Sequence, residues 1–192
     1  MKILILFLSI SFTAQASQFE PTHYQGEKEE VRDVFNSLWS NFKTFDNSHC
    51  YRRAHVLSWQ MSLENINTMK VFWFRGNKLK LSWWYHVAPM VYHKNEGVVL
   101  DRGLSSGATY LTDWLESLSK GKKCIEVFSM EEYRQKKSSE YCLYLIAPMY
   151  YYGPKSLENF DRNEFMESDL KDMLFSIGSL ARSRYLKENP LP

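Results

Sequence analysis

The sequence lacks any apolar run long enough to cross a membrane. Its opening, MKILILFLSISFTAQAS, carries a charged Lys2, an apolar stretch from Ile3 to Phe12, and small residues at Ala14 and Ala16. A membrane-spanning helix needs about 20 apolar residues, so this stretch is too short, and no later segment is both long and uncharged. The pattern predicts a secretory signal peptide over residues 1–16. We expect bacterial export to the periplasm or the medium, without stable membrane association after cleavage.

Repeats, low-complexity tracts and linkers are also absent. Residues 17–192 therefore predict one domain, which is long enough to bury a substantial core. Basic and acidic residues number 24 and 22, and they are mixed along the chain without a basic stripe, so we expect no nucleic-acid partner. Cysteine and histidine do not cluster at ligand spacings, so we expect no metal site. We also expect a monomer.

Cysteine is scarce and odd in number, with three residues in the chain. An oxidising compartment favours disulfide pairing. Cys124 and Cys142 lie in two apolar runs, CIEVF and YCLYLI, which flank a charged segment and can form neighbouring strands. We predict a disulfide between them. Cys50 is then a free thiol next to polar and basic residues, whereas structural free thiols are usually buried among apolar side chains.

The order of the predicted elements indicates an α+β fold. Residues 27–43 place their apolar side chains on one helical stripe, with glutamates at the favourable N-terminal end, and residues 49–64 form a second helical pattern. Strands are predicted at 69–75, 79–92, 97–101, 124–129 and 141–147, and further helices at 109–119 and 163–186. We expect the helices to pack on a mostly antiparallel sheet.

Cys50 is a candidate nucleophile because it falls in the first turn of the second predicted helix, which Asn47 or Ser48 can cap. Unpaired backbone N–H groups and the positive end of the helix dipole favour a thiolate there. The same N–H groups can hold the oxyanion that forms when a thiolate attacks a carbonyl. Such a nucleophile needs a base and a group that orients the base.

Among the five histidines, His86 is the strongest candidate for that base. One face of its predicted strand reads Trp84, His86, Ala88 and Met90. A polar ring in an apolar row indicates a sheltered site, although a lone strand histidine is also commonly structural. His55 projects about 140° away from Cys50 on the same helix and is expected to be structural. His93 lies near a predicted turn, where we expect it to be solvated.

Asp101 is the candidate orienting group, because it ends the next strand and faces the same side as His86 in an antiparallel pair. A turn centred on residues 95–96 leaves Asp101 about 13 Å short of direct opposition to His86. Direct opposition needs a turn centred on residues 93–94, or a bulge. Pro89 is a suitable bulge site because it has no N–H to donate.

Three blocks of the chain, in order, resemble the protein glutaminases, secreted bacterial enzymes that deamidate glutamine side chains in intact proteins. The blocks are Cys50-Tyr51-x-Arg53-Ala54-His55, then Trp83 with Tyr85-His86-Val87-Ala88, then Asp101-x-x-Leu104 followed by Ser105-Ser106-Gly107. The resemblance implies a papain- and transglutaminase-like fold, with the nucleophile helix packed on a mostly antiparallel sheet. It also implies a catalytic triad of Cys50, His86 and Asp101. Arg102 stands where family members usually have proline.

The resemblance further implies that glutamine-bearing proteins or peptides are the substrates, hydrolysed to glutamate and ammonia through a thioester on Cys50. This chemistry needs no cofactor. Trp83, Trp84 and Tyr85 are candidates to bind the glutamine stem. Strand alternation places Trp84 on the face of His86, whereas Trp83 and Tyr85 point away, which favours a core role for those two.

Three other interpretations remain open. The same fold and triad serve a transglutaminase or a thiol protease. A toxin-like deamidase directed at one protein would have the same sequence features. An exported binding domain in which Cys50 does not react is the third.

Overall fold

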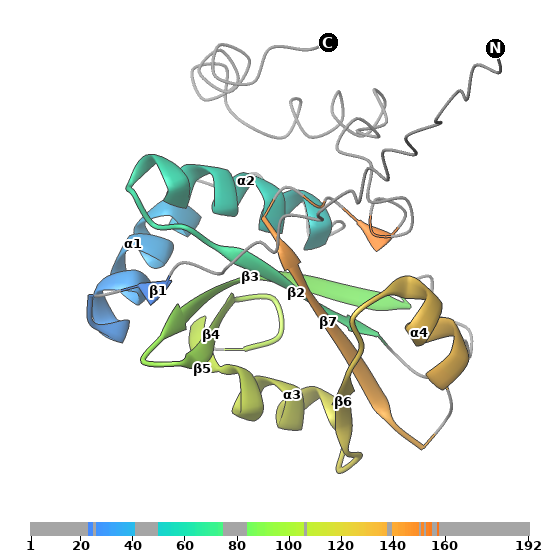
Figure 1. The fold of residues 1–192 in the computed structure, drawn as a ribbon. Coiled ribbons are helices and arrows are strands. Elements are labelled where there is room, and N and C mark those ends of the chain that lie inside the picture. Colours follow the sequence, from blue (N-terminus) through green and yellow to red (C-terminus); the bar gives the residue numbers. More distant parts are fainter. Residues whose placement is uncertain are drawn as a thin grey trace, which may run out of the picture.

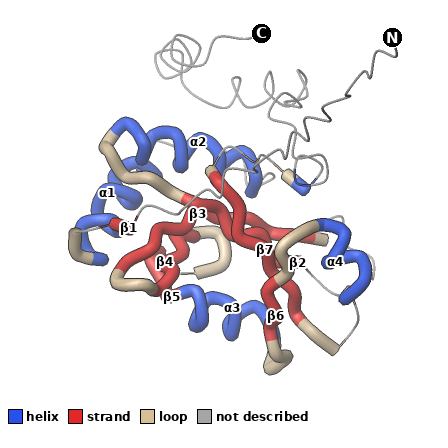
Figure 2. The backbone as a smooth tube through the Cα atoms, viewed as in Figure 1, coloured by secondary structure: helices blue, strands red, loops and turns tan. Residues whose placement is uncertain are grey.

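The structure is a computed structural model, and it describes residues 23–24, 26–40, 50–74, 84–105, 107–137, 140–149, 151, 153–154 and 157. Within these ranges, helices cover both faces of a mostly antiparallel sheet (Figures 1 and 2), so the predicted α+β class is confirmed. The predicted signal peptide, Asn47, Ser48, Trp83 and the predicted helix 163–186 lie outside the described residues. No helix within those ranges is long and apolar enough to span a membrane.

Four helices are described: α1 (Lys28–Ser40), α2 (Cys50–Leu63), α3 (Leu111–Ser119) and α4 (Met130–Lys136). The first three match predicted helices. Helix α4 lies in the charged segment between the two strand cysteines and was not predicted. The side chain of Ser129 accepts a hydrogen bond from the Glu132 backbone N–H and so caps α4. Acidic residues in its first turn and basic residues in its last turn complement the helix dipole.

The sheet contains β1 (His23–Tyr24), β2 (Met69–Phe74), β3 (Tyr85–His93), β4 (Glu96–Asp101), β5 (Gly107–Tyr110), β6 (Cys124–Glu126) and β7 (Cys142–Pro148). The strand order is β5-β4-β3-β2-β7-β6, and β1 pairs with β3. The β1–β3 and β6–β7 pairs are parallel, and the others are antiparallel. The predicted helix 109–119 begins later than expected because residues 107–110 pair with β4 as strand β5.

The two faces of the sheet carry separate apolar clusters. On one face, Val87 of β3 packs with Cys50 and Ala54 of α2, and Val91 packs with residues of α1 and α2. On the other face, Ala88 and Met90 pack with residues of α3 and β2. Figure 1 shows α1 and α2 together on one side of the sheet and α3 on the opposite side. Strand β3 is therefore buried on both faces.

The predicted disulfide is confirmed, since Cys124 and Cys142 are bonded across the neighbouring strands β6 and β7. The Cα atoms of the two residues are 4.3 Å apart. Cys50 is a free thiol, as predicted.

Candidate active site

The β3–β4 hairpin brings His86 and Asp101 to the same face of the sheet. Its turn consists of Lys94 and Asn95, with φ of 48° and 68°. Positive φ at both positions gives the hairpin turn that matches the twist of the strands. Neither predicted turn centre is correct. Continued beyond its last pair, Met90 and Val99, this register brings Asp101 level with Ala88 and diagonal to His86, a separation of about 7–8 Å that long side chains can span.

Strands β3 and β4 separate at the site. Their pairing ends at Met90 and Val99, next to Pro89, which cannot donate to the ladder. Strand β4 nevertheless continues to pair with β5 as far as Asp101. The side chains of His86 and Asp101 meet beyond this point, and His86 Nε2 lies 2.9 Å from Asp101 Oδ2. The diagonal register supplies this contact without the bulge considered at Pro89.

Three donors surround the buried Asp101 carboxylate. Oδ2 accepts from the indole N–H of Trp114 at 3.0 Å and contacts His86 Nε2, while Oδ1 accepts from the Gly103 backbone N–H at 2.8 Å. Burial raises the pKa of Asp101, but the hydrogen bonds from these three groups outweigh burial and lower the pKa below 3.8. Asp101 is therefore ionised at neutral pH.

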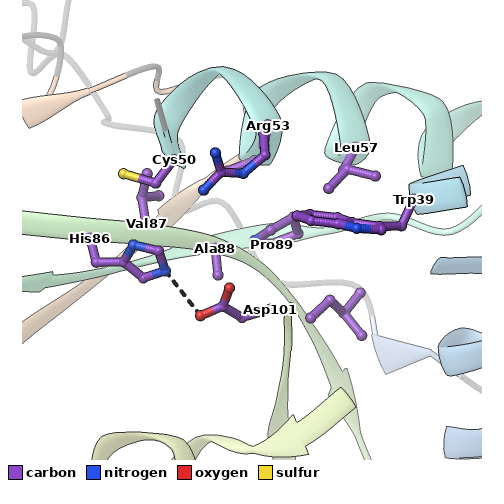
Figure 3. Close-up of a pocket in the computed structure, with 11 residues that line it drawn as sticks. Trp39, Cys50, Arg53, Leu57, His86, Val87, Ala88, Pro89 and Asp101 are labelled. Carbon is purple, nitrogen blue, oxygen red and sulfur yellow. Dashed lines mark hydrogen bonds and ion pairs between the residues drawn. The ribbon is translucent and has the colours of Figure 1, made fainter. Parts of the chain in front are cut away.

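Cys50 approaches from the opposite layer of the molecule. It lies in the first turn of α2, and its side chain is 6% exposed and packs in the cluster that contains Ala54 and Val87. Figure 3 shows the Cys50 side chain over the His86 ring, on the side of the ring that faces away from Asp101. The geometry thus places the imidazole between the thiol and the carboxylate.

Both neighbours of His86 affect its charge. Burial lowers the pKa of His86, but the hydrogen bond and charge of Asp101, together with the nearby Cys50, raise it to about 9. Within the described residues, His86 Nδ1 has no partner in full hydrogen-bonding geometry. Because Cys50 contributes to the raised pKa of His86, its thiol lies close to the ring. At neutral pH the imidazole is protonated beside Cys50.

A small pocket opens to solvent at this junction, with room for about one water molecule. Cys50, His86 and Asp101 line it together with Arg53 and Trp39. Figure 3 shows Arg53 extending from α2 toward the space between the helix and the His86–Asp101 pair. No role was assigned to Arg53 from the sequence. Its spacing of three residues from Cys50 nevertheless places both side chains on one side of the helix.

Of the aromatic residues predicted to bind substrate, Trp84 and Tyr85 are described, and both lie in an apolar setting. Trp84 precedes β3, so strand alternation does not place it with His86 as expected. Its ring lies 5.9 Å from that of Phe74 and 6.0 Å from that of Tyr133. Trp84 and Tyr85 both pack against the cluster that contains Cys50. The core setting expected for Tyr85 is therefore observed.

Two features near the site were missed in the sequence. Trp114 is fully buried on α3, where its indole N–H binds Asp101. Lys70 is also fully buried, and its Nζ lies 2.9 Å from His55 Nδ1 and donates to the Tyr151 carbonyl at 2.6 Å. Burial lowers the pKa of Lys70 and that of His55, which agrees with the structural role expected for His55. His93 is 5% exposed, so its predicted solvation is wrong.

An α+β arrangement in which a helix-start cysteine meets a histidine and an aspartate is characteristic of cysteine-dependent hydrolases and acyltransferases. Residues 31–118 match a protein family described as "Glutaminase". This segment includes all three blocks noted above, so the resemblance to the protein glutaminases is confirmed. Among the described residues there is no group of three or more side chains suited to hold a metal ion.

A solved structure similar to the chain is the NMR structure of protein-glutaminase from Chryseobacterium proteolyticum. The sequences are 18% identical, the match covers 86% of this chain and 93% of that one, and the TM-score is 0.47. No curated protein sequence matches the chain significantly.

Proposed function

We propose that the protein is an exported protein-glutamine glutaminase with Cys50 as nucleophile, His86 as general acid and base, and Asp101 as the group that orients the imidazole. The observation that carries this proposal is the position of the His86 ring, bonded to Asp101 through Nε2 and exposed to Cys50 on its other side. The match of residues 31–118 to the glutaminase family supports the amide of glutamine as the reacting group.

The first chemical step uses the charges of the buried pair. The thiolate of Cys50 attacks the side-chain carboxamide carbon of a protein-bound glutamine, and the carbonyl oxygen becomes an oxyanion. Backbone N–H groups in the first turn of α2 lack intrahelical acceptors and stabilise that oxyanion. The protonated His86 then transfers its proton to the leaving nitrogen, which departs as ammonia and leaves a thioester on Cys50.

The second step regenerates the enzyme. Neutral His86 removes a proton from a water molecule, and the resulting hydroxide attacks the thioester carbon. The carbon–sulfur bond breaks, glutamate is released, and the thiolate and imidazolium are restored. Asp101 stabilises the imidazolium through the Nε2 contact and fixes the ring so that Nδ1 faces the sulfur.

Release of ammonia from a denatured, glutamine-rich protein tests this function. Cys50→Ala, Cys50→Ser and His86→Ala are each expected to abolish release, while circular dichroism and thermal unfolding show an intact fold. Peptide mass spectrometry should locate new glutamates at former glutamines. Wild-type rates from Cys50→Ala would exclude Cys50 as the nucleophile. Cross-linked products or cleaved chains in place of ammonia would identify a transglutaminase or a protease.

Export is part of the same proposal. The Cys124–Cys142 disulfide is typical of proteins that mature in an oxidising compartment. We place the cleavage after Ala16, so that residues 17–192 form a single catalytic domain that is active as a monomer. N-terminal sequencing of the protein recovered outside the cytoplasm should begin at Ser17. The role of Trp83 in binding the glutamine stem stays a prediction.

A further inference from the structure

The geometry points to Arg53 as an anchor for a carboxylate of the substrate, so that the enzyme favours glutamines with an acidic side chain nearby. This inference rests on the proposed function and specifies the kind of glutamine that the site accepts. Arg53 follows Cys50 by three residues on α2 and lines the same cavity as the candidate triad. Its cation is therefore close to the reacting group.

The surroundings of Gly103 show how closely Arg53 approaches His86 and Asp101. A Cβ atom on Gly103 would lie 3.2 Å from Asp101 Oδ1, 3.5 Å from Arg53 Nη2 and 3.8 Å from His86 Cε1. One point in space is thus within 4 Å of the guanidinium, the carboxylate and the imidazole. A methyl group at this point would already be tightly packed, so the three groups converge closely here, and Figure 3 shows Arg53 extending from α2 above the His86–Asp101 pair.

Within the described part of the chain, Arg53 has no anionic partner to neutralise it. In the part of the chain that the structure describes, its guanidinium belongs to none of the ion pairs. Asp101 is the nearby carboxylate, but its oxygens already accept from Gly103, Trp114 and His86. The guanidinium lies 5.9 Å from the ring centre of Trp39, a cation–π contact that holds it in place. A partly buried cation without a counter-ion attracts an anion.

A carboxylate fits this site better than a neutral group. The planar guanidinium offers two parallel N–H donors that match the two oxygens of a carboxylate. Arg53 is one helical turn from Cys50, about 4.5 Å along the axis, and successive residues of an extended peptide are spaced by about 3.3 Å. An aspartate or glutamate one or two positions from the target glutamine can therefore reach Arg53 while the glutamine reaches Cys50.

Blocked heptapeptides with one central glutamine test the inference. Glutamate, alanine or lysine is placed one or two positions before or after the glutamine, and kcat/KM for ammonia release is measured for each peptide. We expect glutamate at one position to raise kcat/KM about tenfold over alanine, the size of a charge-assisted hydrogen bond that is partly open to solvent. Added salt should reduce this preference.

Two substitutions make the assignment specific. Arg53→Met should reduce the difference between the glutamate and alanine peptides to less than about twofold, and Arg53→Lys should keep part of it because charge remains without the planar donor pair. Arg102→Met is the matched control, since Arg102 is exposed beside Asp101 and its loss should leave the positional preference intact. Thermal unfolding of each variant verifies the fold.

Three results would overturn the inference in distinguishable ways. Ammonia release at equal rates from glutamate, alanine and lysine peptides by the wild type would exclude a carboxylate anchor and leave the glutaminase proposal standing. An equal loss in kcat/KM for every peptide in Arg53→Met would show that Arg53 acts on the reacting amide itself. Absence of ammonia from all peptides would remove the proposed function and this inference together.

Discussion

Replacing Trp114 by phenylalanine tests how strongly activity depends on the environment of Asp101. The substitution keeps an aromatic ring on α3 but removes the N–H that donates to Asp101 Oδ2 at 3.0 Å. A hydrogen bond to a charged group contributes about 1.5–3 kcal/mol to stability, and the smaller ring adds a cavity cost. The free energy of unfolding should therefore fall by at least this amount.

The effect on catalysis follows from the pKa values of the pair. Without the indole donor, the pKa of Asp101 rises, and its hold on the protonated imidazole weakens. The pKa of His86, now about 9, falls in consequence. We expect kcat/KM for ammonia release to drop about tenfold, which corresponds to about 1.4 kcal/mol of transition-state stabilisation. The alkaline limb of its pH profile should move to lower pH.

Trp73→Phe is the matched control for this experiment. Trp73 lies on β2 and packs against the same cluster as Trp114, but its indole N–H has no hydrogen-bond partner among the described residues. Its replacement should affect packing without moving the pH profile. A Trp114→Phe protein that folds, retains its kcat and titrates like the wild type would refute the role given to this hydrogen bond.

Three other results are expected. For the wild-type enzyme, kcat/KM should fall as pH rises through about 9, because deprotonated His86 cannot protonate the leaving nitrogen; full activity well above that pH would contradict the assignment. Replacing both Cys124 and Cys142 by alanine should lower the free energy of unfolding by about 3 kcal/mol, the loop-entropy estimate for a sequence separation of 18 residues, as measured by urea denaturation. Burial lowers the pKa of Lys70 below its usual value of 10.5, so the amine is neutral in the folded protein but becomes protonated on unfolding at any pH below 10.5. The free energy of unfolding therefore decreases as pH falls below 10.5. The difference in unfolding free energy between wild type and Lys70→Met should therefore grow in favour of the wild type as pH rises from 7 toward 10.5, and a constant difference would exclude a neutral buried amine.

Patterns with a strong local cause could be predicted from the sequence. The apolar stripes of α1 and α2 and the two cysteine-bearing strands follow from helical and strand periodicity, and the structure contains them. Cys50 and His86 could be proposed as site candidates because a helix-start thiol and a polar ring in an apolar strand are unusual. Helix α4 was missed because its charged residues have no apolar stripe, and a serine cap with dipole-compatible charges is a weaker signal.

Features that depend on tertiary contacts could not be read from local patterns. The turn at Lys94 and Asn95 requires positive φ at two residues, neither of which is glycine. The sequence therefore carries no clear signal for this turn, and the predicted hairpin register differs from the observed one. The hydrogen bond from Trp114 to Asp101 joins residues on different elements, and a tryptophan on an amphipathic helix gives no sign of its partner. The burial of Lys70 likewise depends on His55 of α2 and on Tyr151, which lies 81 residues further along the chain.

The division of the site between two layers affects when the molecule is able to react. Cys50 is held by the layer of α2, whereas the carboxylate that keeps the imidazole charged is fixed by α3 on the other side of the sheet. A newly made chain that has not closed both layers has a cysteine and a histidine but no charged pair between them. Under the proposed mechanism, reactivity toward glutamine therefore arises only when both layers have closed on the sheet.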